Sequence, residues 1–178
     1  NKDLKFKGFF RTCVFLPCAT SLVSYSLIFR SMFATDGLIN SILIKLGILS
    51  TGYNFLGNST SAKIVIIIAL IWRWTGYNMV FYLAGLQNVP QMYLEAAEID
   101  GANSWQRFRH ITFPLLLPSI ASAVVLNLIG GLKLYDVIVA LSGGGPGFTT
   151  HSLASYISNQ YFKAQNAGYS AAVGIFTF

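Results

Sequence analysis

The sequence predicts an all-α protein with several membrane-spanning helices. Of its 178 residues, 54% are hydrophobic and only 10% are charged, and the mean hydropathy is +0.58. An ordinary soluble domain carries roughly 25% charged residues, so this chain has too few to cover a globular surface. The apolar residues also form long segments without the period-two alternation of barrel strands. Because backbone amides in lipid must bond within their own segment, these segments should be helices.

The composition excludes several other classes of protein. High hydrophobicity excludes an intrinsically disordered chain, and two cysteines are too few for a disulfide scaffold. Cys13 and Cys18 would point in different directions on one helix, so we expect packing residues rather than a disulfide or a metal pair. The net charge of +6 comes from scattered Lys and Arg without a basic stripe beside stacking aromatics, so nucleic acid is not an expected partner.

Four segments have the apolar character of membrane spans, given that about 20 residues of helix cover a hydrocarbon core of about 30 Å. They are residues 9–29, 64–86 and 114–141, and a fourth that begins near 167 and runs to 178. The chain opens on Asn1 without a signal peptide and stops inside an apolar run. We therefore expect one transmembrane domain, residues 1–178, that is an internal piece of a longer protein.

The Lys and Arg residues in the connections orient the spans. They are more numerous before the first span and between the second and third, which predicts a cytoplasmic Asn1 end and a cytoplasmic loop 87–113. The segments 31–63 and 142–166 then face outward. In the first of these, apolar residues at helical spacing from Leu38 to Leu46 predict a short helix, lying either in the outer membrane interface or against the bundle itself.

The loop 87–113 has its own helix signals. Pro90 suits the first position of a helix, and Gly101 suits the left-handed residue just past a helix end, so the spacing predicts a helix over 90–101. This helix is too short and too polar to cross the bilayer. A second short helix is expected to be capped by Ser104, and Pro114 is expected to start the third span.

The charge of the 90–101 helix limits its partners. A helix on the cytoplasmic leaflet normally carries Lys and Arg to match anionic lipid, whereas this one carries the acids Glu95, Glu98 and Asp100. Lipid is therefore a poor partner. A basic groove on a soluble protein fits better, since Ala96 and Ala97 permit close approach of a second body. The alternative is that the acids form a solvated face or pair with Arg107 and Arg109.

A family resemblance rests on fixed spacings in this loop. The residues that carry it are Glu95-Ala96-Ala97, Asp100-Gly101-Ala102, Phe108, Ile111, Pro114 and Pro118. They resemble the cytoplasmic signature loop of the permease subunits of binding-protein-dependent ABC importers. The visible departure is Phe113, where the family usually has leucine before the proline; the position stays apolar.

Other segments resemble the carbohydrate group of these permeases. They are Phe15-Leu16-Pro17, Gly37-Leu38-Ile39-Asn40, Trp72 with Gly76, Leu83-Ala84-Gly85-Leu86-Gln87, and Gly143-Gly144-Gly145-Pro146 with Thr149 or Thr150. The resemblance implies the type I ABC importer permease fold, with a core of six transmembrane helices in the bacterial inner membrane. It also implies that the chain forms a heterodimer with a second permease. An extracytoplasmic sugar-binding protein would deliver the substrate to this heterodimer.

The resemblance further implies that the 90–101 helix is a coupling helix seated on a cytoplasmic ATPase dimer. Glu95 would face a basic residue of the ATPase, and Gly101 would allow the sharp turn that follows. Ala96, Ala97 and Asp100 complete the expected coupling residues. ATP and magnesium would be used by the ATPase, so this chain is expected to bind no cofactor and not to be an enzyme.

Polar residues inside the spans are candidates for the substrate pathway: Arg73, Tyr77, Asn78, Asn127 and Tyr135. Amides bind sugar hydroxyls and tyrosine rings stack on sugars, but such residues equally form hydrogen bonds between membrane helices. Arg73 either lines the path or reaches the outer interface, because a charge at that depth needs water or protein. Lys133 and Asp136 are expected to pair across one turn.

No catalytic or metal site is expected. The glycines of 143–147 lack the Lys-Ser/Thr of a phosphate loop and suit an outer turn, and His110 and His151 each lack a second metal ligand. The leading interpretation is the membrane subunit of an ATP-driven sugar importer.

The alternative is an ion-gradient-driven secondary transporter in which Arg73, Lys133 and Asp136 relay charge. Such a carrier has no need of a docking surface for an ATPase, so the acidic helix favours the importer. A membrane-embedded enzyme would need paired acids, a nucleophile with a base or a metal cluster, which the sequence lacks.

Overall fold

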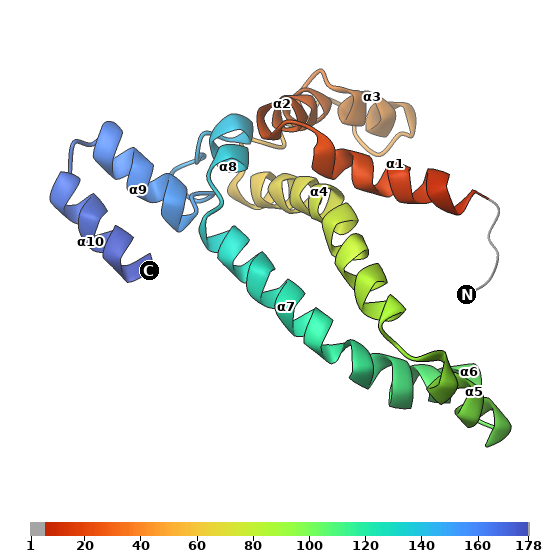
Figure 1. Ribbon diagram of the computed structural model, residues 1–178. Coiled ribbons are helices and arrows are strands. Elements are labelled where there is room, and N and C mark those ends of the chain that lie inside the picture. The colour runs from red at the N-terminus through yellow and green to blue at the C-terminus, as the bar shows by residue number, and fades with distance from the viewer. Residues whose placement is uncertain (1–5, 178) are drawn as a thin grey trace.

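The computed structural model describes residues 6–177, and every regular element among them is helical, which confirms the all-α prediction (Figure 1). In chain order the elements are α1 (Lys7–Ala19), α2 (Leu22–Met32), α3 (Leu38–Lys45), α4 (Ser59–Gln87), α5 (Gln91–Ile99), α6 (Ser104–Arg107), the π-helical turn η1 (Phe108–Thr112), α7 (Phe113–Leu132), α8 (Asp136–Leu141), α9 (Leu153–Phe162) and α10 (Ala167–Thr177).

The two long helices α4 and α7 pack side by side and carry α5 and α6 at one end (Figure 1). The helix α1 lies along α4, while α2 and α8 meet at the opposite end from α5, and α9 pairs with α10. Residues 59–87 and 104–132 are each long and apolar enough to cross a bilayer. The loop that carries α5 is thereby separated from the α2–α8 end by the length of a span.

The first predicted span, 9–29, is not one helix. The chain bends by 97° between α1 and α2, with Thr20 and Ser21 in extended conformations. The Thr20 backbone N–H (3.3 Å) and hydroxyl (2.7 Å) both donate to the carbonyl of Pro17, in place of a continued helical ladder. Hydroxyl side chains that bond nearby backbone compete with helix, and the apolar pattern of the sequence does not register this competition.

The third predicted span, 114–141, begins earlier than expected. A helical run starts at Ser104, capped by Asn103 rather than by Ser104, in a capping box with Gln106. Pro114 has no N–H to donate within this run, and the preceding turn widens to a π-helix in which Phe113 N–H bonds the Phe108 carbonyl. Widening accommodates a proline inside a helix without ending it.

The same span also ends earlier than expected. α7 stops at Leu132, and Tyr135 leaves helical geometry before α8 begins. The short α8 turns back so that Val137, Ile138 and Leu141 become buried. The free energy gained by burying these side chains exceeds that of continuing α7, because Gly130 and Gly131 already weaken the end of this helix.

The expected pair of Lys133 with Asp136 is not formed. Within residues 6–177 the ion pair found is Glu98 with Arg107. Lys133 caps the end of α7, whereas Asp136 lies in the first turn of α8. The break between the two helices removes the one-turn geometry on which the expected pairing depended, and Asp136 instead suits the positive end of the α8 dipole.

The buried core lies where α2, α4 and α8 meet. It consists of Tyr25, Phe29, Val65, Ile66, Ala69, Val137 and Leu141. Most large apolar side chains elsewhere on α4 and α7 remain exposed. A soluble monomer seldom exposes so much apolar surface, which agrees with helices made for a bilayer or for neighbouring subunits.

The connections on the α2–α8 side are ordered by specific hydrogen bonds. The predicted helix within 38–46 is present as α3, and the buried Asn40 side chain donates to the carbonyls of Ala34 and Tyr53, each at 2.8 Å. The 142–166 connection contains α9, a helix that the sequence pattern did not predict. Its glycine-rich start makes the expected turn, with φ of +63° at Gly143 and +87° at Gly144.

Gly76 is required where α1 crosses α4. A Cβ atom at this position would overlap the backbone of Val14 and Phe15, whereas one at Gly131 on α7 would meet nothing within 4 Å. We predict that Gly76→Ala lowers the free energy of unfolding by roughly 1–3 kcal/mol, because overpacking separates the two helices. Gly131→Ala is the matched control and should not destabilise. Thermal unfolding of the detergent-purified protein measures both, and equal midpoints would contradict the close crossing.

Candidate functional site

The helix α5 is delimited by backbone chemistry at both ends. Pro90 is extended (ψ 129°) and caps the helix, so the first helical residue is Gln91, one position later than predicted. At the other end Gly101 has φ +78°, the left-handed conformation that the sequence predicts. The Gly101 N–H donates to the Glu98 carbonyl at 3.1 Å and the Ala102 N–H to the Ala97 carbonyl at 2.9 Å. This glycine-closed end fixes the direction in which the chain leaves α5.

The three acids of α5 differ in their surroundings. Glu98 accepts a hydrogen bond from Arg107 Nη1 at 2.6 Å and forms an ion pair with it. Glu95 and Asp100 are exposed, and neither forms an ion pair with another residue of the described part of the chain. Pairing with the chain's own arginines, one of the two alternatives left open by the sequence, therefore applies to Glu98. Glu95 and Asp100 present their carboxylates to solvent.

Apolar side chains are exposed beside these carboxylates. Ile99 is 87% exposed, and Met92 and Trp105 are each 65% exposed. No residue of α5 is buried. A surface that combines exposed large apolar side chains with free carboxylates has the composition of a docking surface for a partner with basic groups.

The two alanines of α5 face the rest of the loop. Ala96 and Ala97 line a hollow of about 440 Å³ between α5 and the start of α7, together with Tyr93, Asp100, His110, Ile111, Pro114 and Leu115. Their small side chains leave this hollow open. A larger side chain at either position would occupy part of this hollow.

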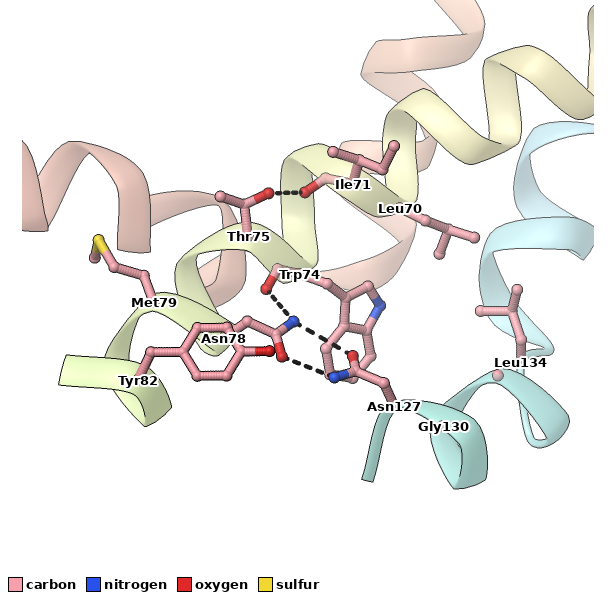
Figure 2. Close-up of a pocket in the computed structure, with 11 residues that line it drawn as sticks. Leu70, Ile71, Trp74, Thr75, Asn78, Met79, Tyr82, Asn127, Gly130 and Leu134 are labelled. Atoms are coloured by element: carbon pink, nitrogen blue, oxygen red, sulfur yellow. Dashed lines mark hydrogen bonds between the residues drawn. The ribbon is translucent and has the colours of Figure 1, made fainter. Parts of the chain in front are cut away.

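A second candidate site lies between α4 and α7, where Asn78 and Asn127 meet. Asn127 Nδ2 donates to Asn78 Oδ1 at 2.7 Å, and Asn78 Nδ2 donates to Asn127 Oδ1 at 3.3 Å (Figure 2). Each amide also donates to a carbonyl of its own helix, Trp74 or Ala123. The reciprocal pair borders a cavity of about 530 Å³ whose other lining includes Trp74, Thr75 and Tyr82.

The structure brings together two of the five predicted pathway residues. Asn78 and Asn127 line the cavity, but the Tyr77 ring packs against Trp74 and Phe81 instead. Tyr135 lies at a separate hollow beside α9, where its hydroxyl accepts from Ser158 at 3.3 Å.

Arg73 is also outside the cavity, and its guanidinium bonds the backbone at the α1–α2 bend. Trp74 and Tyr82 also line the cavity and were not among the residues predicted for the pathway. They lie four residues either side of Asn78, so helical spacing from this asparagine could have identified them.

The two asparagines should stabilise the α4–α7 pair jointly. Interhelical hydrogen bonds in membrane proteins contribute about 0.6 kcal/mol on average and up to about 1.7 kcal/mol. We predict that Asn78→Ala and Asn127→Ala each lower the free energy of unfolding, and that the double variant loses less than the sum of the two. A double-mutant cycle in detergent measures this coupling energy, and strictly additive losses would show that the amide pair contributes nothing.

The chain is similar to known proteins over nearly its whole length. Residues 2–178 match the family model described as binding-protein-dependent transport system inner membrane component. The chain is 46% identical over 165 residues to the lactose transport system permease protein LacF of Rhizobium radiobacter, covering 92% of this chain and 55% of that protein. It is 36% identical to the arabinooligosaccharides transport system permease protein AraP of Bacillus subtilis, covering 98% of this chain and 56% of that protein.

A solved structure has the same fold. A chain of a bacterial ABC transporter involved in the import of the acidic polysaccharide alginate superposes with a TM-score of 0.85 and 25% sequence identity. The match covers 98% of this chain and 62% of that one. This chain therefore spans little more than half the length of the relatives that it matches.

Proposed function

The chain belongs to the family of binding-protein-dependent transport system inner membrane components, and we propose that it is part of the membrane-spanning subunit of an ATP-driven sugar importer. Similarity to permeases named for lactose, arabinooligosaccharides and multiple sugars supports the substrate class. The ion-driven alternative is not supported, because family and fold are those of ABC importer permeases.

The surface of α5 is the observation that carries the proposal. Within residues 6–177 Glu95 and Asp100 have no ion-pair partner, and Met92 and Ile99 are exposed apolar side chains on the same short helix. A cytoplasmic ATPase dimer with a basic, apolar-lined cleft would cover both kinds of group. A charge-assisted hydrogen bond from that cleft to Glu95 would orient the helix within it.

The connections of α5 provide the coupling route. Two residues separate α4 from Pro90, and the loop returns through α6 and η1 directly into α7. The Glu98–Arg107 ion pair joins α5 to α6 within the loop. Closure of the ATPase dimer on ATP and magnesium would therefore move α5 and, with it, the ends of both long helices. The loop is then cytoplasmic, and the α2–α8 end faces the extracytoplasmic sugar-binding protein.

The cavity between α4 and α7 is the proposed segment of the sugar path. Its lining offers the Trp74 and Tyr82 rings for stacking and the Thr75 hydroxyl and two amides for sugar hydroxyl groups. The opposite wall would come from the second permease of a heterodimer. In this division of labour the permease performs no chemistry, and ATP hydrolysis belongs to the ATPase subunits.

Reversal of charge at Glu95 should uncouple the importer. In the complete complex in proteoliposomes, Glu95→Lys is expected to lower sugar uptake at least ~tenfold, because the charge-assisted contact becomes repulsive. Gln91→Lys places the same charge one turn earlier on α5 and should retain most uptake. ATP hydrolysis stimulated by the sugar-loaded binding protein is measured in parallel, with permease content as the control for folding. Normal uptake by Glu95→Lys would contradict the coupling role.

Gly101 offers a test that involves no charge. Gly101→Val places a β-branched residue at φ +78°, which costs of order 1–2 kcal/mol and favours a different chain direction after α5. We expect weaker retention of the ATPase on affinity-purified permease. Gly101→Asn is the matched control, because asparagine tolerates the left-handed region, and should retain the ATPase. Equal retention by the two variants would show that the turn is unimportant for docking.

A further inference from the structure

Arg73 makes an unusual set of contacts for a charged residue within a membrane span. Its Nη1 donates to the Thr20 carbonyl at 2.7 Å and to the Pro17 carbonyl at 3.1 Å. Its guanidinium carbon lies 5.0 Å from the centre of the Tyr25 ring. Pro17 lies in the last turn of α1, Thr20 lies in the bend and Tyr25 is the first buried residue of α2. One side chain of α4 thus contacts both sides of the α1–α2 bend.

These contacts answer a physical requirement of the bend. A helix that ends within an apolar segment leaves carbonyl groups without amide partners, and such groups are costly in lipid. The Pro17 carbonyl also accepts from Thr20, whereas the Thr20 carbonyl accepts from Arg73. The end of α1 also carries the negative end of the helix dipole, which a cation stabilises. A guanidinium supplies several donors and a charge at once, and the Tyr25 ring offers a further favourable cation–π contact.

A second contact on the same face of α4 holds α1 against it. Gly76, one turn along α4, lies against the backbone of Val14 and Phe15. The guanidinium of Arg73 therefore sits at a place where two helix backbones already touch. Arg73 does not line the cavity bordered by Asn78 and Asn127. Its contacts are with the protein's own backbone rather than with the proposed sugar path.

We infer that Arg73 is a positioning residue that holds the α1–α2 bend against α4. The functional part of this inference rests on the proposed function: α4 leads directly to α5, so a movement of α5 driven by the ATPase reaches the bend through Arg73. The bend lies towards the α2–α8 end, where sugar would enter. Arg73 then transmits the state of the loop to the outer half of the permease without touching the sugar.

Distance measurements on the bend test the structural part of the inference. Cys13 on α1 is an exposed native cysteine, and Leu27 on α2 is 52% exposed. Spin labels at Cys13 and Leu27→Cys, in a Cys18→Ser background, report the angle between the helices by pulsed electron resonance. Arg73→Gln should broaden the distance distribution, and Arg73→Lys, which keeps the charge, should broaden it less. Arg30→Gln, at an exposed arginine of α2, is the matched control and should leave it unchanged.

Transport kinetics separate a positioning role from a substrate contact. In the complete importer we expect Arg73→Gln to lower kcat at least ~tenfold while KM for the sugar-loaded binding protein changes less than ~twofold. A changed KM with an unchanged distance distribution would overturn the inference and place Arg73 on the sugar path. An unchanged distribution with normal transport would also overturn it. Should no ATPase assemble with the wild-type chain, the proposed function fails, whereas the distances in the isolated permease still test the bend.

Discussion

Every backbone carbonyl inside an apolar span needs a partner from the protein, and this constraint governs where the helices of this chain depart from regular geometry. At the α1–α2 bend, Arg73 of α4 supplies donors to the carbonyls of Pro17 and Thr20. Ahead of Pro114, a π-helical turn re-forms the ladder around the missing N–H. Between α4 and α7, the amides of Asn78 and Asn127 bond each other and their own helices. The bend and the π-helical turn are therefore held by hydrogen bonds, and so are the polar side chains between the two long helices.

The long helices α4 and α7 connect the loop that carries α5 to the opposite end of the structure. The helix α4 reaches from the loop at one end to the buried core with α2 and α8 at the other, and α7 packs along it and returns the chain from the loop (Figure 1). In the loop, Glu98 is neutralised by Arg107, while Glu95 and Asp100 stay free beside exposed apolar side chains. The surface of α5 can thus bind a basic partner, and α5 is connected at both ends to long helices that would move with it. The proposed importer mechanism requires both properties.

The parts of the fold that depend on local chemistry could be predicted from the sequence. The left-handed Gly101 and the end of α5 follow from the residue types present, and the apolar length of α4 contains the predicted span 64–86. The breaks at Thr20 and Lys133 could not, because both lie in apolar stretches. The first combines local bonds of Thr20 to Pro17 with a distant partner, Arg73, and the second depends on the burial of α8. The helix α9 has a local signal in the sequence, the capping box of Ser152 and Ser155.

The candidate sites divide in the same way. Asn78 and Asn127 were identifiable by residue type, but their mutual bond joins positions 49 residues apart, which no local pattern reveals. Charge alone left the acids of α5 with two possible uses, and geometry assigns Glu98 to Arg107. Arg73 was expected on the sugar path or at the outer interface. Its contacts with backbone carbonyls could not be predicted, because they depend on the bend between α1 and α2.

Site-specific photo-crosslinking in the assembled membrane tests the central claim most directly. A photoreactive residue at Ile99, 87% exposed on the loop side, is compared with one at Leu128, 63% exposed on α7. Docking of α5 on the ATPase predicts a covalent product with the ATPase subunit from position 99 and none from position 128. Absence of that product from position 99 in cells that contain the ATPase, or equal yields from both positions, would contradict the assignment of α5 as the helix that receives the force of ATP hydrolysis.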